Sequence, residues 1–160
     1  MSSDLNYAAI VAAPVGLLGV RMRAGELAGI DFSPPADAVA KAPDPATREV
    51  LDQLFRYFED PAWRFQLALA SGGTPFQRRV RQALVAIPCG CTRSYGELAR
   101  ELGSSARAVG GACRRNPIPI VVPCHRVIAA GGDVGGFMGQ REGDALAIKH
   151  WLLNHERRRP

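Results

Sequence analysis

Apolar residues in the first third of the chain come in short runs that are separated by turn residues. Residues 7–12 are mostly apolar, residues 14–16 are typical of a turn, and apolar positions then alternate with polar or small ones over 18–23 and 27–32. An alternation of period two indicates strands that bury one face. The pattern predicts a meander of short strands.

A connection and a helix follow these strands. Residues 33–45 are rich in proline and alanine and show no periodicity, which is typical of a loop. Over 46–58 the apolar residues gather on one side of a predicted helix, with Val50, Leu54 and Tyr57 on one face and Leu51, Phe55 and Phe58 beside it. The "SGG" at 71–73 then predicts a boundary between residues 1–70 and residues 71–160.

The second part of the chain opens with a helix-capping sequence. Thr74 is a favourable N-cap, Pro75 suits the first helical position, and Gln77 completes a capping box. The helix that starts here has four apolar residues on one face: Phe76, Val80, Leu84 and Ile87.

Two further helices are predicted close together. Ser94 and Glu97 form a second capping box, and Gly103 closes the short helix that they open. One of the serines at 104 and 105 then caps a third helix over 106–115. Two short helices joined by a tight turn with glycine predict a helix-turn-helix.

The stretch "NPIPIVV" at 116–122 is apolar but contains two prolines, so it is not an ordinary central strand. We expect an extended, largely buried segment that crosses the domain. Asn116 precedes a proline, where the helical region is disfavoured. Its amide is expected either to bond nearby backbone or simply to form a turn.

The charge is unevenly distributed along the chain. Residues 1–70 hold six Lys/Arg and nine Asp/Glu, a net of −3, whereas residues 71–160 hold fourteen and six, a net of +8. A basic half beside an acidic half favours contact with a polyanion. An arginine-rich solvated surface without a partner is an equal alternative.

Several classes of protein are disfavoured. No apolar run is long enough to span a membrane, and the first residues lack the basic start and apolar stretch of a signal peptide, so a cytoplasmic protein is expected. The four cysteines are Cys89, Cys91, Cys113 and Cys124. We expect them to be free thiols, and "CGC" lacks the spacing of a zinc site, so neither a metal nor a cofactor is expected.

Cys124 lies in the most unusual chemical setting. If Pro123 takes the first position of a helical turn, the thiol lies at a helix N-terminus, and His125 and Arg126 follow it. Such surroundings lower the pKa of a thiol and favour the reactive thiolate. The alternative is a small buried apolar residue, which is the usual role of a free cysteine.

A carboxylate could orient the neighbouring histidine. Ile148, Leu152 and Glu156 are spaced i, i+4, i+8 on a last helix predicted over 144–156, so Glu156 lies on the apolar face and needs a partner. A Cys–His–Glu relay that runs through a water is one interpretation. In the other, Glu156 lies past the helix end and pairs with the arginines at 157–159.

Arg107 is placed in the first turn of the third helix, where the helix dipole disfavours a cation. Either it points away from its helix toward an anionic or stacked partner, or an exposed arginine is simply tolerated there.

Several motifs occur together and in order: "TPFQRRV" (74–80), "IPCG" (87–90), "SYGELARELG" (94–103), "ARAVGGACRRNPIPIVVPCHRVI" (106–128) and "KHWLLNHE" (149–156). With "PCHRV" at its centre, this set resembles the O6-alkylguanine-DNA alkyltransferase family. The resemblance is strong over 74–156 and weak over the first third. It implies an α+β fold, in which a small N-terminal α/β domain with an antiparallel sheet supports a C-terminal helical domain that contains a helix-turn-helix.

The resemblance also implies a function. The protein would repair DNA by one irreversible transfer of the alkyl group from O6-alkylguanine, and also from O4-alkylthymine, to Cys124. The base would be flipped out of the duplex to reach the thiol. The expected partner is double-stranded DNA with alkylated guanine, no membrane is involved, and the protein is expected to be a monomer.

The implied roles fall on particular residues. Cys124 is the nucleophile, His125 the base that acts through water, and Glu156 its orienting carboxylate. Asn116 ties the active-site turn to the helix-turn-helix, and Tyr95 assists the leaving O6. The residues implied to bind DNA are Arg107, as the intercalating side chain, and Tyr95, Ala106, Gly110, Arg114 and Arg115. The residues implied to line the substrate pocket are Pro119, Val127, Phe137 and Met138.

The chain departs from the family pattern in places. Arg81 stands where tryptophan is usual, Phe137 and Met138 alter the active-site loop, and residues 140–144 resemble an insertion. Two alternatives to alkyl transfer follow from the same residues. A DNA-binding relative or regulator would recognise damage without transfer, and a Cys–His hydrolase would turn over.

Overall fold

The computed structural model describes residues 6–132, 134–138 and 143–157. The chain divides into two compact units, Met1–Ser71 and Gly72–Pro160. The first unit contains β1 (Asn6–Tyr7), β2 (Ala9–Ala13), β3 (Gly16–Arg23), β4 (Glu26–Phe32), β5 (Val39–Ala40) and α1 (Pro45–Glu59). The second contains α2 (Pro75–Val85), β6 (Arg93–Ser94), α3 (Tyr95–Leu102), α4 (Ala106–Arg114), the single turn η2 (Cys124–Arg126), β7 (Val127–Ile128), the turn η3 (Ala130–Gly132) and α5 (Asp144–Arg157).

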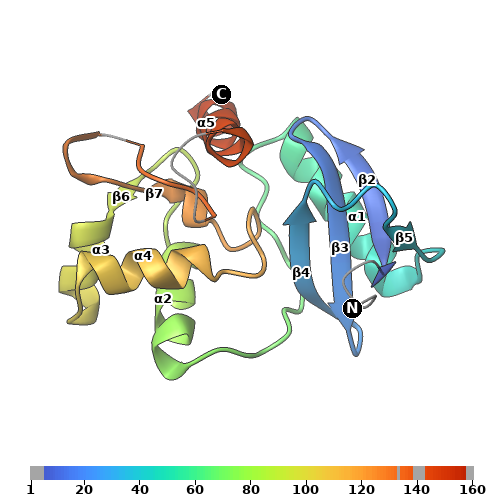
Figure 1. The fold of residues 1–160 in the computed structure, drawn as a ribbon, viewed down its shortest axis with the longest axis horizontal. Coiled ribbons are helices and arrows are strands. Elements are labelled where there is room, and N and C mark those ends of the chain that lie inside the picture. Colours follow the sequence, from blue (N-terminus) through green and yellow to red (C-terminus); the bar gives the residue numbers. More distant parts are fainter. Residues whose placement is uncertain (1–5, 133, 139–142, 158–160) are drawn as a thin grey trace. The chain divides into compact units, whose positions relative to one another are not determined.

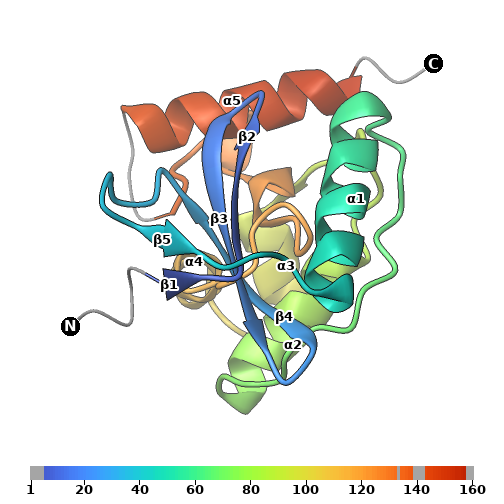
Figure 2. The same ribbon diagram turned by 90° about the vertical axis from the view of Figure 1, so that its right-hand side faces the viewer.

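The predicted meander is present as the antiparallel sheet β2-β3-β4, with α1 lying along it (Figures 1 and 2). The single strand predicted over 7–12 is instead two strands. β1 pairs in parallel with β5, which lies in the stretch predicted to be a loop. Such a short pair shows no periodicity in the sequence, so the pattern could not reveal it.

Turn geometry sets the register of the sheet. Ala24 and Gly25 connect β3 to β4, and both have positive φ, 51° and 80°. A two-residue hairpin that matches the twist of its strands needs this conformation at both positions. In β3, Gly19 must be a glycine because a Cβ there would lie 2.5 Å from the Tyr7 ring. These features hold the strands close enough to share one core.

The core of the first unit joins the sheet to α1. Asp44 caps α1 by accepting a hydrogen bond from the Thr47 amide at 2.8 Å, and Pro45 starts the helix, which was predicted over 46–58. Seven buried apolar residues form the centre of this core: Leu18, Val20, Leu27, Ile30, Val50, Leu54 and Tyr57.

The three capped helices of the second unit are confirmed. Both predicted capping boxes are formed, at Thr74 for α2 and at Ser94 for α3. Gly103 ends α3 with φ 64°, and Ser105 is the N-cap of α4. Helices α3 and α4 pack against each other as a helix-turn-helix (Figure 1).

The segment at 116–123 differs from the prediction, because it is buried but coiled rather than extended. The Val122 amide donates to the Ile118 carbonyl at 2.9 Å, and Ile120 has φ 73°. A β-branched residue in this region is strained by about 1–3 kcal/mol. Asn116 closes the turn, since its Nδ2 donates to the Val122 carbonyl at 2.8 Å and its Oδ1 accepts from the Ile118 amide at 3.1 Å.

A helix long and apolar enough to cross a membrane does not occur within the described ranges.

Candidate active site

The second unit contains a cavity of about 610 Å³. Its wall combines the start of α3, one face of α4, the turn η2 and the loop before α5. The lining residues include Tyr95, Ala106, Arg107, Gly110, Cys113, Arg114, Cys124, Gly135, Phe137 and Met138. Most of the residues predicted for DNA binding and for the pocket therefore meet at one cavity.

Three of the predicted residues lie elsewhere. Pro119 is buried in the coiled segment, Val127 is buried in β7, and Arg115 is exposed just after α4. Within the described ranges none of the three lines the cavity. The predicted insertion is described only at Gly143 and Asp144, and its residues 140–142 lie outside the described ranges.

Cys124 is buried, with 3% of its surface exposed, and it begins the turn η2 rather than a longer helix. Pro123 is the N-cap of this turn rather than its first helical residue. The Cys124 amide already donates to the Val122 carbonyl at 2.8 Å. Cys124 is thus the first residue of a helical turn, as expected from the sequence, but this turn is only three residues long.

The prediction of a lowered thiol pKa is wrong in this structure. Burial is the largest influence, and it raises the pKa of the Cys124 thiol. A hydrogen bond from the Asn116 side chain and the charge of Lys149 lower that pKa in part. The sequence shows the neighbouring cations but not the loss of water around the sulfur.

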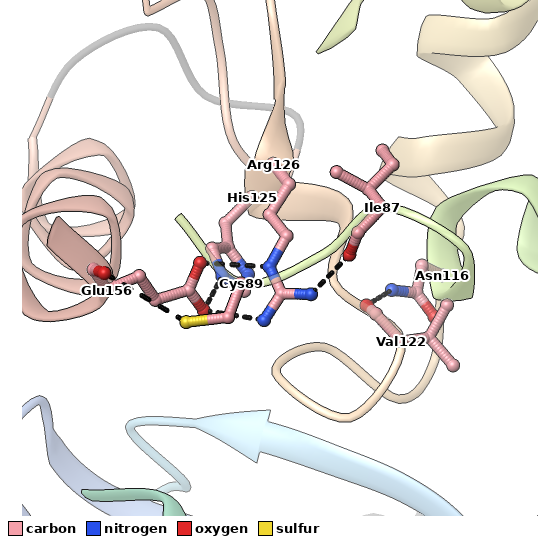
Figure 3. A network of polar contacts seen from close by, with 7 residues as sticks. All are labelled: Ile87, Cys89, Asn116, Val122, His125, Arg126 and Glu156. Carbon is pink, nitrogen blue, oxygen red and sulfur yellow. Dashed lines mark hydrogen bonds and ion pairs between the residues drawn. The ribbon is translucent and has the colours of Figure 1, made fainter. Parts of the chain in front are cut away.

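The side chains of His125, which follows Cys124 in the chain, and Glu156 lie together (Figure 3). The His125 Nε2 is 2.7 Å from the Glu156 Oε2, and both residues are almost completely buried. The structure thus brings together the histidine and carboxylate of the proposed relay. The alternative pairing is not seen at Arg157, which donates to Asn154 instead, while the arginines at 158 and 159 lie outside the described residues.

The protonation of this pair follows from its partners. Burial works to raise the pKa of Glu156, but the hydrogen bond from His125 and the ion pair with Arg126 outweigh it and lower that pKa to about 2. Burial lowers the pKa of His125, and the opposing effect of Glu156 does not reverse this. A carboxylate only accepts, so the neutral imidazole carries its hydrogen on Nε2. Nδ1 is left as the basic nitrogen, buried and without a hydrogen-bond partner among the described residues.

Lys149 is a residue of this site that sequence reasoning missed. Its side chain is fully buried, and Nζ donates to the Val127 carbonyl at 2.7 Å and to the Gly136 carbonyl at 2.9 Å. It also lies 5.8 Å from the centre of the Tyr95 ring. One cation thus joins the strand after Cys124, the loop before α5 and the aromatic wall of the cavity.

Tyr95 is enclosed by glycines. A Cβ on Gly110 would lie 4.0 Å from its ring, and a Cβ on Gly135 would lie 3.4 Å from it. Gly135 also has φ 75°, a conformation that favours glycine. The backbone of α4 and that of the loop thus both lie close to the ring.

Cys113 is a second thiol of the cavity wall. Burial and the neighbouring Cys124 raise its pKa to about 12, against a smaller opposing effect of Lys149. It is therefore a neutral thiol near pH 7. Among the described residues, no group of three or more His, Cys, Asp or Glu side chains gathers to hold a metal.

Helix α4 presents a basic face beside the cavity. Arg107 and Arg114 are exposed and line the cavity, and Arg115 is exposed at the helix end. The fold and the site together define a class of protein: a helix-turn-helix domain whose second helix borders a pocket with a buried thiol in its wall.

Comparison with known proteins agrees with this class. The profile of the family described as "6-O-methylguanine DNA methyltransferase, DNA binding domain" matches residues 75–158. A "Methylated-DNA--protein-cysteine methyltransferase" of Salmonella typhimurium is 55% identical over 92 residues, which cover 56% of this chain and 51% of that protein. One of Mycobacterium tuberculosis is 47% identical over 120 residues, which cover 73% and 70%.

Two solved structures are similar over most of the chain. The M. tuberculosis OGT in complex with DNA has a TM-score of 0.79 and 39% identity, and the match covers 94% of this chain and 93% of that one. An O6-methylguanine DNA methyltransferase from Methanococcus jannaschii has a TM-score of 0.67 and 26% identity, with 95% of each chain covered. The chain belongs to the 6-O-methylguanine DNA methyltransferase family. It spans about half the length of the Salmonella relative that it matches.

Proposed function

We propose that this protein repairs O6-alkylguanine, and also O4-alkylthymine, in double-stranded DNA by transferring the alkyl group once and irreversibly to Cys124. The observation that carries the proposal is the position of Cys124. Cys124 lines the cavity, while the adjoining His125 is hydrogen-bonded to Glu156. The names of the related proteins support the same chemistry.

The proton of the thiol must leave before the sulfur can attack, because burial raises the thiol pKa. His125 Nδ1 is the basic nitrogen of the neutral ring and takes this proton, directly or through a water. Glu156 then stabilises the imidazolium that forms. The thiolate exists only when it is needed, so its nucleophilicity is not lost to a low pKa.

The bond changes balance in one step. The sulfur of Cys124 forms a bond to the alkyl carbon, the bond from that carbon to O6 breaks, and guanine leaves with the electron pair. The Tyr95 hydroxyl assists by donating to the leaving base, which finally takes up a proton. The thioether is stable, so each molecule reacts once.

A stacked base cannot reach a thiol that is 3% exposed, so the nucleotide must rotate into the cavity. Helix α4 borders the cavity with Arg107 and Gly110. The Arg107 side chain would enter the duplex, and Gly110 would let the helix approach it closely. Arg114 and Arg115 would contact phosphates. Asn116 would hold the turn that carries Cys124 next to the end of α4.

We also propose that the protein acts as a monomer, because one chain supplies every group named above. Its four free cysteines suit the reducing cytoplasm. Residues 72–160 would carry the reaction, and residues 1–71 would support the fold.

Intact mass measurement tests this function. The protein is mixed with a duplex that contains one O6-methylguanine, and we expect a gain of one methyl group per chain that peptide mapping places on Cys124. The Cys124→Ser variant should gain nothing, while Cys91→Ser, which alters an exposed thiol, should react like the wild type. DNA binding without a mass gain would favour the non-transferring relative, and multiple turnover would favour the hydrolase.

A further inference from the structure

Arg126 follows His125 in the chain, and its side chain reaches the same carboxylate (Figure 3). Its Nε donates to the Glu156 Oε1 and its Nη2 donates to the Glu156 Oε2, each at 2.9 Å. This is a two-pronged contact, which fixes both the distance and the rotation of a carboxylate. Oε2 also accepts a hydrogen bond from the His125 Nε2, so this one oxygen accepts from both His125 and Arg126.

A third donor ties Arg126 to the rest of the domain. Its Nη1 donates to the Ile87 carbonyl at 2.6 Å, just beyond the end of α2. The side chain is 12% exposed, so these contacts are largely shielded from water. Arg126 therefore connects the turn η2, the end of α5 and the chain that follows α2.

These contacts leave Glu156 little freedom. With Oε1 and Oε2 both held by the planar guanidinium, the carboxylate cannot rotate about its last bond without losing two charge-assisted hydrogen bonds. The orientation that it keeps is the one that presents Oε2 to the His125 Nε2.

We infer that Arg126 is a positioning residue for the alkyl transfer proposed above, on which this inference rests: it holds the Glu156 carboxylate so that His125 keeps its hydrogen on Nε2 and offers Nδ1 as the base. Arg126 does not line the cavity, and it acts through Glu156.

Charge supports the same role. The charged groups that act on His125 are Glu156 and Lys149 from α5 and Arg126 from its own turn. Burial lowers the pKa of His125, Glu156 raises it, and Arg126 and Lys149 lower it. Without Arg126 the carboxylate would act on the imidazole alone, and His125 would hold a proton at higher pH. A protonated His125 cannot take the proton of Cys124.

Two variants separate the charge of Arg126 from its shape. Arg126→Met removes both, whereas Arg126→Lys keeps the charge but loses the planar fork. Arg157→Met is the matched control, because it removes an exposed arginine next to Glu156 that bonds to Asn154 and not to the carboxylate. The substrate is the free base O6-benzylguanine, which leaves DNA binding out of the measurement, and the rate of a single transfer is followed as a function of pH.

At neutral pH we expect Arg126→Met to react about ten- to a hundredfold more slowly than the wild type, as befits a displaced catalytic group. Its rate should recover at higher pH, because the acidic side of the pH–rate profile moves to higher pH. Arg126→Lys should keep the pH–rate profile of the wild type and lose rate by about threefold to tenfold. Arg157→Met should match the wild type in both respects.

Several outcomes would overturn the inference. An Arg126→Met variant that folds and keeps the rate and the pH profile of the wild type would do so. If that variant does not fold, the rate of Arg126→Lys tests the inference instead. An unchanged rate would show that the bidentate contact of the guanidinium with Glu156 is not needed. Titration of the His125 ring by NMR gives a second readout without any reaction, and an unshifted titration in Arg126→Met would also contradict it. A wild type that takes up neither a benzyl group from the free base nor a methyl group from the duplex would overturn the proposed function instead.

Discussion

At the scale of single residues, the site depends on buried charges that neutralise one another. Glu156, Arg126 and Lys149 are ionised groups with little exposure, and each contacts a partner that would otherwise be unsatisfied. Removing one member of such a set costs more than the set contributes, because a buried charge is left alone. Substitutions here should therefore change stability and reactivity together.

Acid should unfold the protein partly through Glu156. Its folded pKa of about 2 lies below the usual value of 4.5, so it contributes stability above pH 4.5 that is lost as the pH falls toward 2. The lowered pKa of His125 acts in the same direction, starting below its usual 6.5. We expect Glu156→Gln to cost about 3–5 kcal/mol at pH 7 and progressively less toward pH 2. Urea unfolding at pH 7, 5 and 3 measures this, with Glu59→Gln, at an exposed position, as control. A cost that stays constant with pH would contradict the assignment.

Lys149 should partly offset the effect of burial on the acidity of the Cys124 thiol. It lowers the Cys124 pKa, so Lys149→Met should raise that pKa and move thiol alkylation to higher pH. The Val127 and Gly136 carbonyls would also lose a buried donor, at about 1–3 kcal/mol each. Iodoacetamide labelling of Cys124 against pH, with peptide mapping, is the measurement. The exposed Lys41→Met variant should label like the wild type, and an equal shift in both would remove the role of Lys149.

Some of these features of single residues could be predicted from the sequence. The spacing of Ile148, Leu152 and Glu156 predicted a carboxylate on an apolar face, and Glu156 is buried against His125. The same helix holds the signal for Lys149, which lies seven residues before Glu156 and so on a similar face. The Cys124 pKa could not be obtained, because burial is a property of the packed chain and outweighs the neighbouring cations.

At the scale of elements, helix α4 would join the proposed recognition of DNA to the proposed chemistry. It carries Arg107 near its start and Cys113 near its end, and both line the cavity. Caps made these helices predictable, because a cap needs only a few adjacent residues. The coiled turn at 116–123 was not, because its geometry depends on which backbone groups Asn116 bonds, those of Ile118 and Val122, and on a strained Ile120.

Arg107 should matter for duplex DNA and little for a free base. If it fills the space of the extruded nucleotide, Arg107→Ala should slow repair of O6-methylguanine in a duplex by on the order of tenfold to a hundredfold. Reaction with free O6-benzylguanine should be almost unchanged. Parallel single-turnover rates compare the two, with Arg78→Ala, at an exposed position on α2, as control. An equal loss on both substrates would exclude the role in extrusion.

At the scale of the whole molecule, the two compact units differ in charge. The basic excess of residues 71–160 belongs to the unit that contains the helix-turn-helix and the cavity. The arrangement of the elements within each unit matches the expected α+β fold. The pairing of β1 with β5 escaped prediction because two-residue strands depend on tertiary contacts rather than on pattern.

Binding to DNA should weaken steeply with salt. If the basic unit contacts about 6–10 phosphates, affinity for a duplex should fall by about 10³–10⁵ between 50 and 200 mM salt. The reaction with free O6-benzylguanine should hardly respond over the same range, which makes it the internal control. A duplex affinity that is insensitive to salt would favour the solvated-surface interpretation of the arginines.

The position of Glu156 in the last turn of α5 has a consequence for dynamics. Helix termini are normally the first part of a helix to open, yet here the terminal turn carries a group of the site. His125, Arg126 and the Cys89 thiol, which is 4.0 Å from the Glu156 carbonyl, all hold this turn. Brief unwinding there would remove Glu156 from His125 while leaving Cys124 in place. The capacity for the proposed repair would therefore vary with the local opening of one helical turn.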